Sequence, residues 1–239
     1  MQKQGKYRRI MLKLTGELFG DPEHGMGIYT PSYDKFAKMI GDIHNEYDCE
    51  IVIVVGAGNI FRGARQDDID QAIGDNMGML GTVINGIALQ EALEKYGEIT
   101  RLMTAMSIPA MAELFIRRKA LRHLEKGRIV ILGGGTGNPF FTTDSCAALR
   151  ASELNCEVVL KGSSVDGIYD KDPKEFDDAI KYDEVSYSEA LEKGLKVMDN
   201  TAFALCQNKK IPIVVFDIYK QRAINRILDG EKEGTIVKQ

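Results

Sequence analysis

The sequence contains no tryptophan, few prolines and only 4 cysteines among its 239 residues. The cysteines form no CxxC pair and have no histidine cluster beside them; they are Cys49, Cys146, Cys156 and Cys206. This scatter favours neither a disulfide framework nor a zinc site. We therefore expect reduced thiols, and we assign no residue as a metal ligand.

Long apolar runs and an excess of basic charge are also missing. The apolar stretch behind the basic N-terminal residues is interrupted by Lys13 and Glu17, which makes it too short and too charged for a signal peptide. No other stretch approaches the length of a membrane span. The net charge of −4 provides no basic field for nucleic acid or an anionic membrane. We expect a cytoplasmic protein that binds neither.

What the sequence does contain is a regular alternation of strand-like and helix-like segments. Ile51–Val55 and Ile129–Leu132 are short β-branched runs bounded by turn residues, as expected of buried parallel strands. The alternation predicts an α/β fold in which a mainly parallel central sheet carries helices on both faces, in three αβα layers. No linker or repeat divides residues 1–239, so we expect a single domain.

Three of the expected elements bear on the later argument. A helix is expected at 75–96, with Asp75 near its N-cap and with glycines that allow close packing at a subunit contact. A second helix is expected at 110–125. The chain is expected to end in an edge strand at 234–237.

Residues 128–150 (RIVILGGGTGNPFFTTDSCAALR) combine a strand, a glycine-rich turn and the start of a helix. Gly133–Gly135 end the strand, and Thr142–Asp144 offer hydroxyl and carboxylate caps for the helix. A helix N-terminus behind such a turn directs backbone N–H groups and the positive end of a dipole at an anion. The alternative is an ordinary turn between a strand and a helix, in which the glycines only permit positive φ.

Two lysines, Lys13 and Lys161, each stand where an apolar strand-like run ends. The carboxyl ends of parallel strands meet at one rim of a sheet, where ligands bind. Two ammonium groups with Asp144 between them would suit phosphoryl transfer, which needs fixed positive charge at phosphate oxygens. Each lysine could instead extend into solvent at a sheet edge. The motifs GxxxxGK[ST] and HRD…DFG are absent from the sequence, which excludes P-loop and protein kinases.

A second glycine-rich turn contains Gly56, Gly58 and Arg62. Phe61 occupies the place of the third glycine of a dinucleotide-binding turn, so that signal is weak. Arg62 can bind a phosphate through two N–H groups, or it can be a solvated loop residue. Asp75 can cap its helix or accept a hydrogen bond from a ribose hydroxyl.

Six segments, in chain order, resemble the bacterial uridylate kinases, which belong to the amino acid kinase fold family. They are KLTGE (Lys13–Glu17), VVGAGNIFRG (Val54–Gly63), GDNMGMLGTVING (Gly74–Gly86), GTGNPFFTTDS (Gly135–Ser145), LKGSSVDGIYDKDP (Leu160–Pro173) and MDNTAF (Met198–Phe203). TGNPFFTTD and GDxMGML are specific to uridylate kinases. The strand-end lysine and the GxG turn are shared with kinases of the family that act on aspartate, glutamate, carbamate or acetylglutamate. The resemblance covers nearly the whole chain.

The resemblance implies Mg²⁺-dependent transfer of the ATP γ-phosphoryl group to UMP, giving UDP and ADP for pyrimidine nucleotide synthesis. The catalytic residues it implies are Lys13, Lys161, Asp144 and Asp199. The implied ATP contacts are Lys13, Leu14, Thr15, Gly16, Gly58, Arg62, Ser163, Tyr169 and Asp172. The implied UMP contacts are Ala57, Arg62, Asp75, Thr136, Gly137, Asn138, Pro139, Phe140, Phe141, Thr142 and Thr143. UMP binding and oligomer contacts would then lie mainly in the N-terminal part, and ATP binding mainly from about residue 160 onward.

The resemblance further implies a homohexamer that GTP activates and UTP inhibits. Arg101 and Arg128 match positions associated with GTP, whereas other positions of that site are substituted here. The loop GDPEHGMG (residues 20–27) is longer than is common, Ala57 replaces a glycine, and Ser163 stands where threonine is common. Two other activities stay open: a nucleotide-sensing regulatory protein of the same fold, and a related kinase acting on a carboxylate or carbamate.

Overall fold

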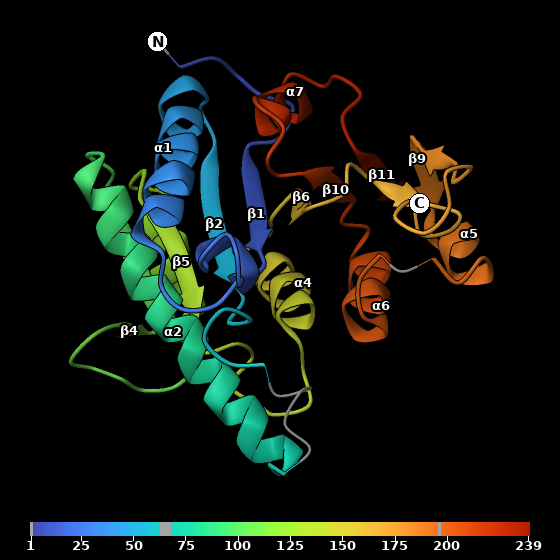
Figure 1. The fold of residues 1–239 in the computed structure, drawn as a ribbon. Helices are drawn as coiled ribbons and strands as arrows, with labels where there is room; N and C mark the ends of the chain where they lie inside the picture. The colour runs from blue at the N-terminus through green and yellow to red at the C-terminus, as the bar shows by residue number, and fades with distance from the viewer. Residues whose placement is uncertain (1, 63–67, 196) are drawn as a thin grey trace.

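The computed structural model describes residues 2–62, 68–195 and 197–239, so Gly63, at the end of the segment VVGAGNIFRG, lies outside the described residues. Within them the central sheet has the strand order β4-β3-β5-β2-β1-β6-β10-β11-β9 (Figure 1). Its strands are β1 (Arg9–Leu14), β2 (Glu50–Val55), β3 (Thr100–Thr104), β4 (Glu113–Leu114), β5 (Ile129–Gly133), β6 (Val158–Ser163), β9 (Glu184–Ser186), β10 (Ile213–Asp217) and β11 (Thr235–Lys238). Among the described strand pairs of this central sheet, only β10–β11 is antiparallel, which confirms the expected mainly parallel sheet.

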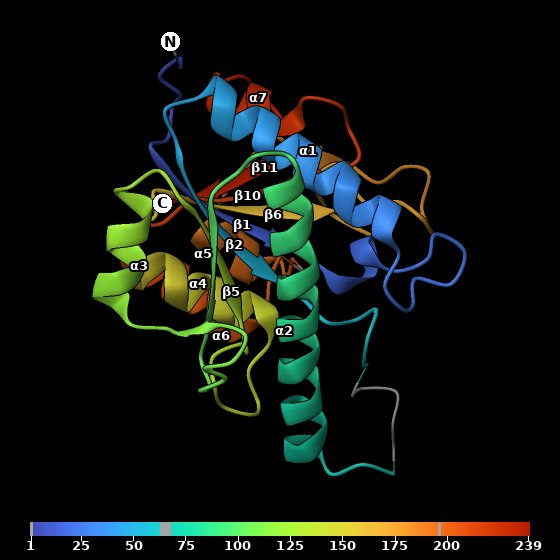
Figure 2. The same ribbon diagram turned by 90° about the vertical axis from the view of Figure 1, so that its left-hand side faces the viewer.

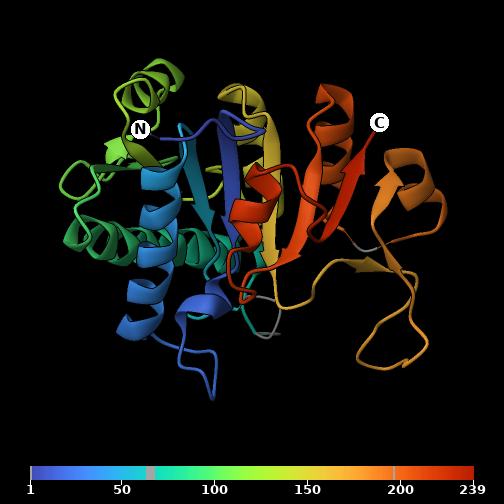
Figure 3. The ribbon, with the colours of Figure 1, turned by 90° about the horizontal axis from the view of Figure 1, so that it is seen from above.

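Helices cover both faces of the sheet, as Figure 3 shows from above. One apolar cluster joins the sheet to α1, α2 and α7, and the other joins it to α3, α4, α5 and α6. The helices are α1 (Thr30–Glu46), α2 (Gln71–Lys95), α3 (Arg117–Leu124), α4 (Thr143–Glu153), α5 (Tyr187–Glu192), α6 (Asn200–Lys209) and α7 (Ala223–Leu228), with the 3₁₀ helix η1 (Gly16–Phe19). The three αβα layers are therefore confirmed. Among the helices described, none is both long and apolar enough to cross a membrane.

The beginning of α2 lies earlier than expected. Its N-cap is Asp70, whose carboxylate accepts hydrogen bonds from the backbone N–H groups of Ala72 and Ile73 at 3.1 and 3.3 Å. Asp75, expected near the cap, lies in the second turn. Gly74 lowers the helix propensity of the first turn, which is why the sequence pattern placed the start too late. The first turns of α2 extend beyond the rim of the sheet (Figure 2).

Two glycines of α2, Gly81 and Gly86, allow close packing within this chain, whereas a Cβ atom at Gly78 would meet open space. A Cβ atom at Gly81 would lie 2.8 Å from the Cβ of Ala57, and one at Gly86 would lie 2.7 Å from Leu102 Cδ1. Both distances are too short for a larger residue without a shift of the neighbour. Gly81 and Gly86 therefore let α2 approach the second glycine-rich turn and strand β3.

Two further expectations were wrong. Residues 110–125 do not form one helix, because β4 pairs with β3 before α3 begins. Strand β11 is not at an edge, because it lies between β10 and β9. In both cases the local pattern showed apolar residues but carried no information about which strand lies beside them.

Candidate active site

Lys13 and Lys161 bind the same carboxylate. Lys13 Nζ lies 2.8 Å from Asp144 Oδ1, and Lys161 Nζ lies 2.8 Å from Asp144 Oδ2. Lys161 Nζ also donates a hydrogen bond to the backbone oxygen of Val197 at 2.7 Å. Asp144 Oδ1 is buried without an aligned hydrogen bond, so Lys13 is held there as an ion pair. The structure thus places two cations on one anion, as the strand-end lysines indicated.

Sheet geometry explains why the two lysines meet. Lys13 and Lys161 are direct partners in the parallel register of β1 with β6. Side chains alternate between the faces of a strand, so each lysine lies on the same face as the residue two positions before it. Met11 and Val159 both belong to the apolar cluster that includes α4. The lysines therefore point to the face on which Asp144, in the first turn of α4, is located.

Burial disfavours both charged forms, so it raises the pKa of a carboxyl group and lowers the pKa of a lysine. The side chains of Lys13 and Asp144 are 11% and 14% exposed. Burial disfavours the ionised carboxylate, but the two ammonium groups outweigh this effect and hold the pKa of Asp144 below its usual value. Burial also lowers the pKa of Lys161, against the opposing attraction of Asp144. Asp144 therefore stays ionised and anchors two lysines at adjacent strand ends.

We expect Asp144→Asn to lower the free energy of unfolding by about 3 kcal/mol near neutral pH, because it leaves two largely buried ammonium groups without their counter-ion. The folded pKa of Asp144 is below its unfolded value, so its stabilising effect is complete above the unfolded pKa and is lost as the pH falls through the folded pKa. The difference between wild type and variant should shrink below about pH 4. Urea unfolding over this pH range measures it, and a pH-independent difference contradicts the prediction.

Asp199 supports the first turn of α4 from the neighbouring helix. It caps α6 by accepting from the backbone N–H of Ala202 at 2.9 Å. Its carboxylate also accepts hydrogen bonds from the hydroxyls of Thr142 and Ser145, the latter at 2.9 Å. Thr142 in turn caps α4 by accepting from the N–H groups of Asp144 and Ser145. Asp199 thus holds the helix start that carries Asp144.

The second glycine-rich turn packs directly against the end of β1. We call residues 56–62 the glycine loop. A Cβ atom at Gly16 would lie 2.3 Å from the backbone N of Gly58, so only glycine fits there. Arg62 donates from Nε to Gly58 O at 2.8 Å, and its Nη2 lies 3.2 Å from Glu17 Oε1. Glu17 also accepts a hydrogen bond from Thr15. Thr15, Gly16, Gly58 and Arg62 are therefore brought together, next to Lys13.

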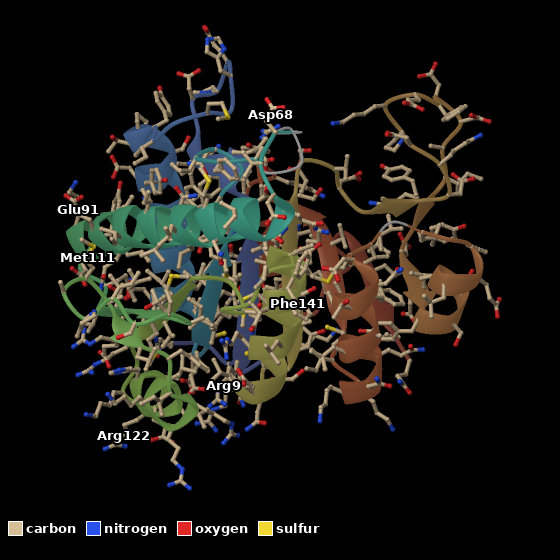
Figure 4. The ribbon with its side chains drawn as sticks, turned by 90° about the horizontal axis from the view of Figure 1, so that it is seen from below. Arg9, Asp68, Glu91, Met111, Arg122 and Phe141 are labelled. Carbon is tan, nitrogen blue, oxygen red and sulfur yellow. The ribbon has the colours of Figure 1, made fainter. Side chains whose placement is uncertain are left out.

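A cavity of about 230 Å³ lies between the glycine loop, α2 and the start of α4. Its lining residues are Ala57, Gly58, Phe61, Gly74, Asp75, Gly78, Met79, Thr82, Gly135, Phe141, Thr142 and Thr143. We call it the acceptor cavity. The strand arrows of β1 and β2 point downward in Figure 1, so Figure 4, seen from below, looks onto this rim and shows Phe141 beside α4. Asp144 follows Thr143, so the cavity adjoins the lysine cluster.

The turn at 136–140 lies outside the lining of the acceptor cavity, although it was expected to contact the same ligand. Phe140 has φ +70°, a strained value for a non-glycine residue, and is 66% exposed. Its backbone N–H donates to Asp75 Oδ2 at 2.7 Å, which fixes the turn on α2. Thr136 Oγ1 and the backbone of Asn138 bond to each other at 3.2 Å.

A second cavity of about 460 Å³ is formed by residues 164–174, beginning three residues after Lys161. Tyr169 and Asp172 line it, whereas Ser163 does not and accepts a hydrogen bond from the N–H of Val165 at 3.2 Å. Tyr169 lies in the hairpin of β7 (Ile168–Tyr169) and β8 (Lys181–Tyr182). Its hydroxyl donates to Asp166 at 2.5 Å, and this bond raises the pKa of Tyr169 to about 12. We call this space the donor cavity.

Sequence reasoning missed several polar residues in the wall of the acceptor cavity and behind it. Thr82 is buried, and its hydroxyl accepts from the N–H of Gly134 at 2.7 Å, which joins α2 to the turn after β5. Asn59 and Asn85 are buried as well. One signal was present, because an asparagine within the apolar helical stretch TVINGIAL has poor helix propensity. Such a residue indicates a buried hydrogen-bonding role.

Comparison with known proteins gives consistent matches over most or all of the chain. The model of the amino acid kinase family matches residues 8–217. The UMP kinase of Bacillus anthracis is 34% identical with a TM-score of 0.92, covering 97% of this chain and 96% of that one. The UMP kinase of Ureaplasma parvum is 38% identical with a TM-score of 0.91 and full coverage of both chains. The uridylate kinase of Archaeoglobus fulgidus is 26% identical with a TM-score of 0.71, covering 95% and 99%.

Proposed function

The chain belongs to the amino acid kinase family, and we propose that it transfers the γ-phosphoryl group of ATP to UMP, giving UDP and ADP. The observation that carries the proposal is the pair of strand-end lysines on Asp144, which directly follows two residues that line the acceptor cavity. Both bacterial relatives named UMP kinase align with at least 97% of this chain. Their identity of 34–38% is high enough to support the same reaction in this chain.

The geometry suits direct in-line transfer. The acceptor is already an anionic phosphate oxygen, so no general base is required. Lys13 and Lys161 provide fixed positive charge where the transferred group passes, and Asp144 keeps both ammonium groups oriented. The N–H groups at the start of α4 and in the glycine loop add further donors for phosphate oxygens. Arg62, beside Gly58, is placed to bind a phosphate after exchange of its partner Glu17.

A magnesium ion that arrives with ATP fits the oxygen donors at the site. Asp144 is occupied by two lysines, whereas Asp199 accepts only from hydroxyl and amide groups among the described residues. Carboxylate and phosphate oxygens are the ligands that Mg²⁺ prefers. Asp199 would hold the ion together with the ATP phosphates. When bound, Mg²⁺ neutralises phosphate charge and favours departure of ADP.

We assign UMP to the acceptor cavity and ATP to the donor cavity. Asp75, Ala57 and Phe141 line the first, which suits a ribose hydroxyl, a phosphate near backbone N–H groups and a base. Tyr169 and Asp172 line the second. UMP binding is thus assigned mainly to residues before about 160 and ATP binding mainly to residues after it, within one domain of 1–239. We also assign the reaction to the cytoplasm, where all four cysteines would remain free thiols as in the structure.

One assay separates this function from its alternatives. ADP release is measured with UMP, CMP, aspartate, glutamate or carbamate as acceptor, each with and without GTP. We expect release with UMP to exceed that with every other acceptor. Release with none of them favours a nucleotide-sensing protein, and release with a carboxylate or carbamate favours a related kinase. The paired lysines argue against a sensor, because nucleotide binding without turnover needs no cations at the position of transfer.

Self-association is proposed from the outer face of α2. Five large apolar side chains, spaced three or four residues apart, are 38–54% exposed. They are Ile73, Met77, Leu80, Ile84 and Ile87. A continuous apolar face of this kind marks a binding surface, and in Figure 2 α2 lies in front with this side of the molecule uncovered. A second copy of the chain is the proposed partner, with a hexamer as the assembly.

Ile84→Asp is expected to reduce the oligomeric mass, because it introduces a charge into the apolar face of α2. Sedimentation velocity at micromolar concentration measures the effect. Ile180→Asp is the matched control, since Ile180 is also exposed but lies in the loop before β8. A mass that is unchanged in Ile84→Asp, or equally reduced in both variants, contradicts the proposal.

GTP activation and UTP inhibition are proposed as well. The proposal of GTP activation rests on a surface at which four side chains contact one another in sequence: Arg101, Glu113, His123 and Arg128. Glu113 lies 3.6 Å from Arg101 Nε and 3.3 Å from His123 Nε2, and His123 Nδ1 lies 3.0 Å from Arg128 Nη1. Two guanidinium groups near each other suit a polyphosphate. The GTP arm of the assay, repeated with Arg128→Ala, tests this surface: activation that is unaltered by the substitution contradicts it.

A further inference from the structure

Two asparagine side chains, Asn59 and Asn85, bind each other behind the acceptor cavity. Asn85 Nδ2 donates to Asn59 Oδ1 at 2.7 Å, and Asn59 Nδ2 donates back to Asn85 Oδ1 at 3.1 Å. Asn59 is 1% exposed and Asn85 is fully buried. Buried amides are costly unless their polar atoms are paired. The two hydrogen bonds of this pair are not screened by water, and they fix the orientation of both side chains.

The asparagine pair also binds three other parts of the chain. Asn85 Nδ2 donates to the backbone oxygen of Gly56, at the start of the glycine loop, at 2.7 Å. Asn59 Nδ2 donates to Gly27 O at 2.9 Å, and the N–H of Gly27 returns a bond to Asn59 O at 2.7 Å. The hydroxyl of Tyr33, on α1, donates to Asn85 Oδ1 at 2.7 Å. One buried network therefore connects α1, α2, the loop 20–27 and the glycine loop.

The network joins two walls of the acceptor cavity that belong to different elements. Ala57 and Gly58 of the glycine loop line one side, and Asp75 and Thr82 of α2 line the other. Asn85 is located on α2 and is bonded to the glycine loop at two points, Gly56 O and the Asn59 side chain. A change in these bonds alters the relative position of the walls without removing any lining residue.

We propose that Asn59 and Asn85 are positioning residues that set the shape of the acceptor cavity and so its affinity for the acceptor nucleotide. This inference rests on the proposed function, because the acceptor is taken to be UMP. Neither side chain lines the cavity, so each acts through the glycine loop rather than by contact with a ligand. The donor cavity is formed by residues 164–174, which the network does not contact.

The first test compares Asn59→Leu and Asn85→Leu with wild type. Each substitution leaves buried partners unpaired, and we expect the KM for UMP to rise about 10-fold while the KM for ATP stays within about twofold. The control is Asn225→Leu. Asn225 is 7% exposed and donates to Glu46 at 2.7 Å, but it belongs to α7. It should lose stability without a change in the KM for UMP. A KM for UMP within about twofold of wild type in both Asn59→Leu and Asn85→Leu overturns the inference.

A milder substitution keeps the inference testable if the leucine variants do not fold. Tyr33→Phe removes one hydroxyl donor to Asn85 and keeps the ring, which stacks on Phe19 with centroids 4.6 Å apart. We expect its KM for UMP to rise about threefold. Should the leucine variants fail to fold, an unchanged KM for UMP in Tyr33→Phe overturns the inference.

Hydrogen exchange provides a readout that does not depend on the substrate. The N–H of Gly56 is bonded to Leu14 O at 2.8 Å, and those of Ile60 and Phe61 are bonded to Ala57 O at 2.8 and 2.9 Å. We expect these amides to exchange faster in Asn85→Leu, or in Tyr33→Phe, than in Asn225→Leu. Equal exchange overturns the inference even if wild type phosphorylates UMP. A wild type that does not phosphorylate UMP refutes the proposed function, while faster exchange in Asn85→Leu would still support the positioning role.

Discussion

Alanine in place of Lys161 is expected to lower kcat for UMP by ~10²-fold or more, with the KM for UMP changed less. The Lys161 ammonium lies 2.8 Å from Asp144, three residues before the donor cavity begins, and we propose that it stabilises the charge that the transferred group gains at its oxygens. A loss of ~10²-fold corresponds to about 2.7 kcal/mol of transition-state stabilisation, a typical contribution of one fixed charge. Lys13→Ala should behave in the same way, because Lys13 is held by the other oxygen of Asp144.

The control for both lysine variants is located at the opposite end of β1. Arg9 Nε lies 2.5 Å from Glu50, and the two side chains are 18% and 17% exposed, so Arg9→Ala also breaks a partly buried ion pair. We expect Arg9→Ala to lower the unfolding temperature but to leave kcat nearly unchanged. Steady-state kinetics and thermal unfolding of the three variants separate catalysis from stability. Near-wild-type turnover in both lysine variants refutes the proposed mechanism.

The strands and their charged ends could be predicted because each depends on local sequence. The run ending in Lys13 is apolar and short, and the run ending in Lys161 repeats this pattern. Parallel strands bring their carboxyl ends to one rim whatever their order in the sheet. The proximity of both lysines to the helix that begins near Asp144 was therefore predictable. Their direct pairing was not, because register depends on contacts between β1 and β6 that no local pattern records.

The acceptor cavity was harder to predict because its walls come from segments far apart in the chain. Phe141 and Asp75 were expected at one ligand, and both line the cavity. The residues of the turn at 136–140 do not, because the bond from Phe140 N–H to Asp75 fixes this turn on α2. Hydrophobic periodicity does not predict the Asn59–Asn85 pair, because Asn59 alone is typical of a turn and Asn85 alone is a weak helix former. Only tertiary packing makes them partners.

Asn in place of Asp75 is expected to raise the KM for UMP by ~10- to 100-fold, with a smaller effect on kcat. Asp75 is half-buried in the second turn of α2 and lines the acceptor cavity. Its Oδ2 accepts from the N–H of Phe140 at 2.7 Å, so Oδ1 remains to accept from a ribose hydroxyl. The amide of asparagine can still accept from Phe140, but it offers the sugar a neutral donor in place of a charged acceptor. A hydrogen bond to a charged group contributes about 1.5–3 kcal/mol, which gives the expected range.

A substrate that lacks one hydroxyl identifies the atom that Asp75 binds. Wild type should prefer UMP to 2′-deoxy-UMP or to 3′-deoxy-UMP, and Asp75→Asn should lose most of that preference, because the missing hydroxyl and the missing charge belong to one bond. Asp70→Asn is the matched control: Asp70 is a carboxylate on the same helix that only caps it, and asparagine is an equally good N-cap. A preference that stays intact in Asp75→Asn contradicts the ribose contact. In that case the main role of Asp75 is to hold the turn at Phe140. Asp75→Asn should then raise the KM for UMP and for both deoxy substrates by the same factor.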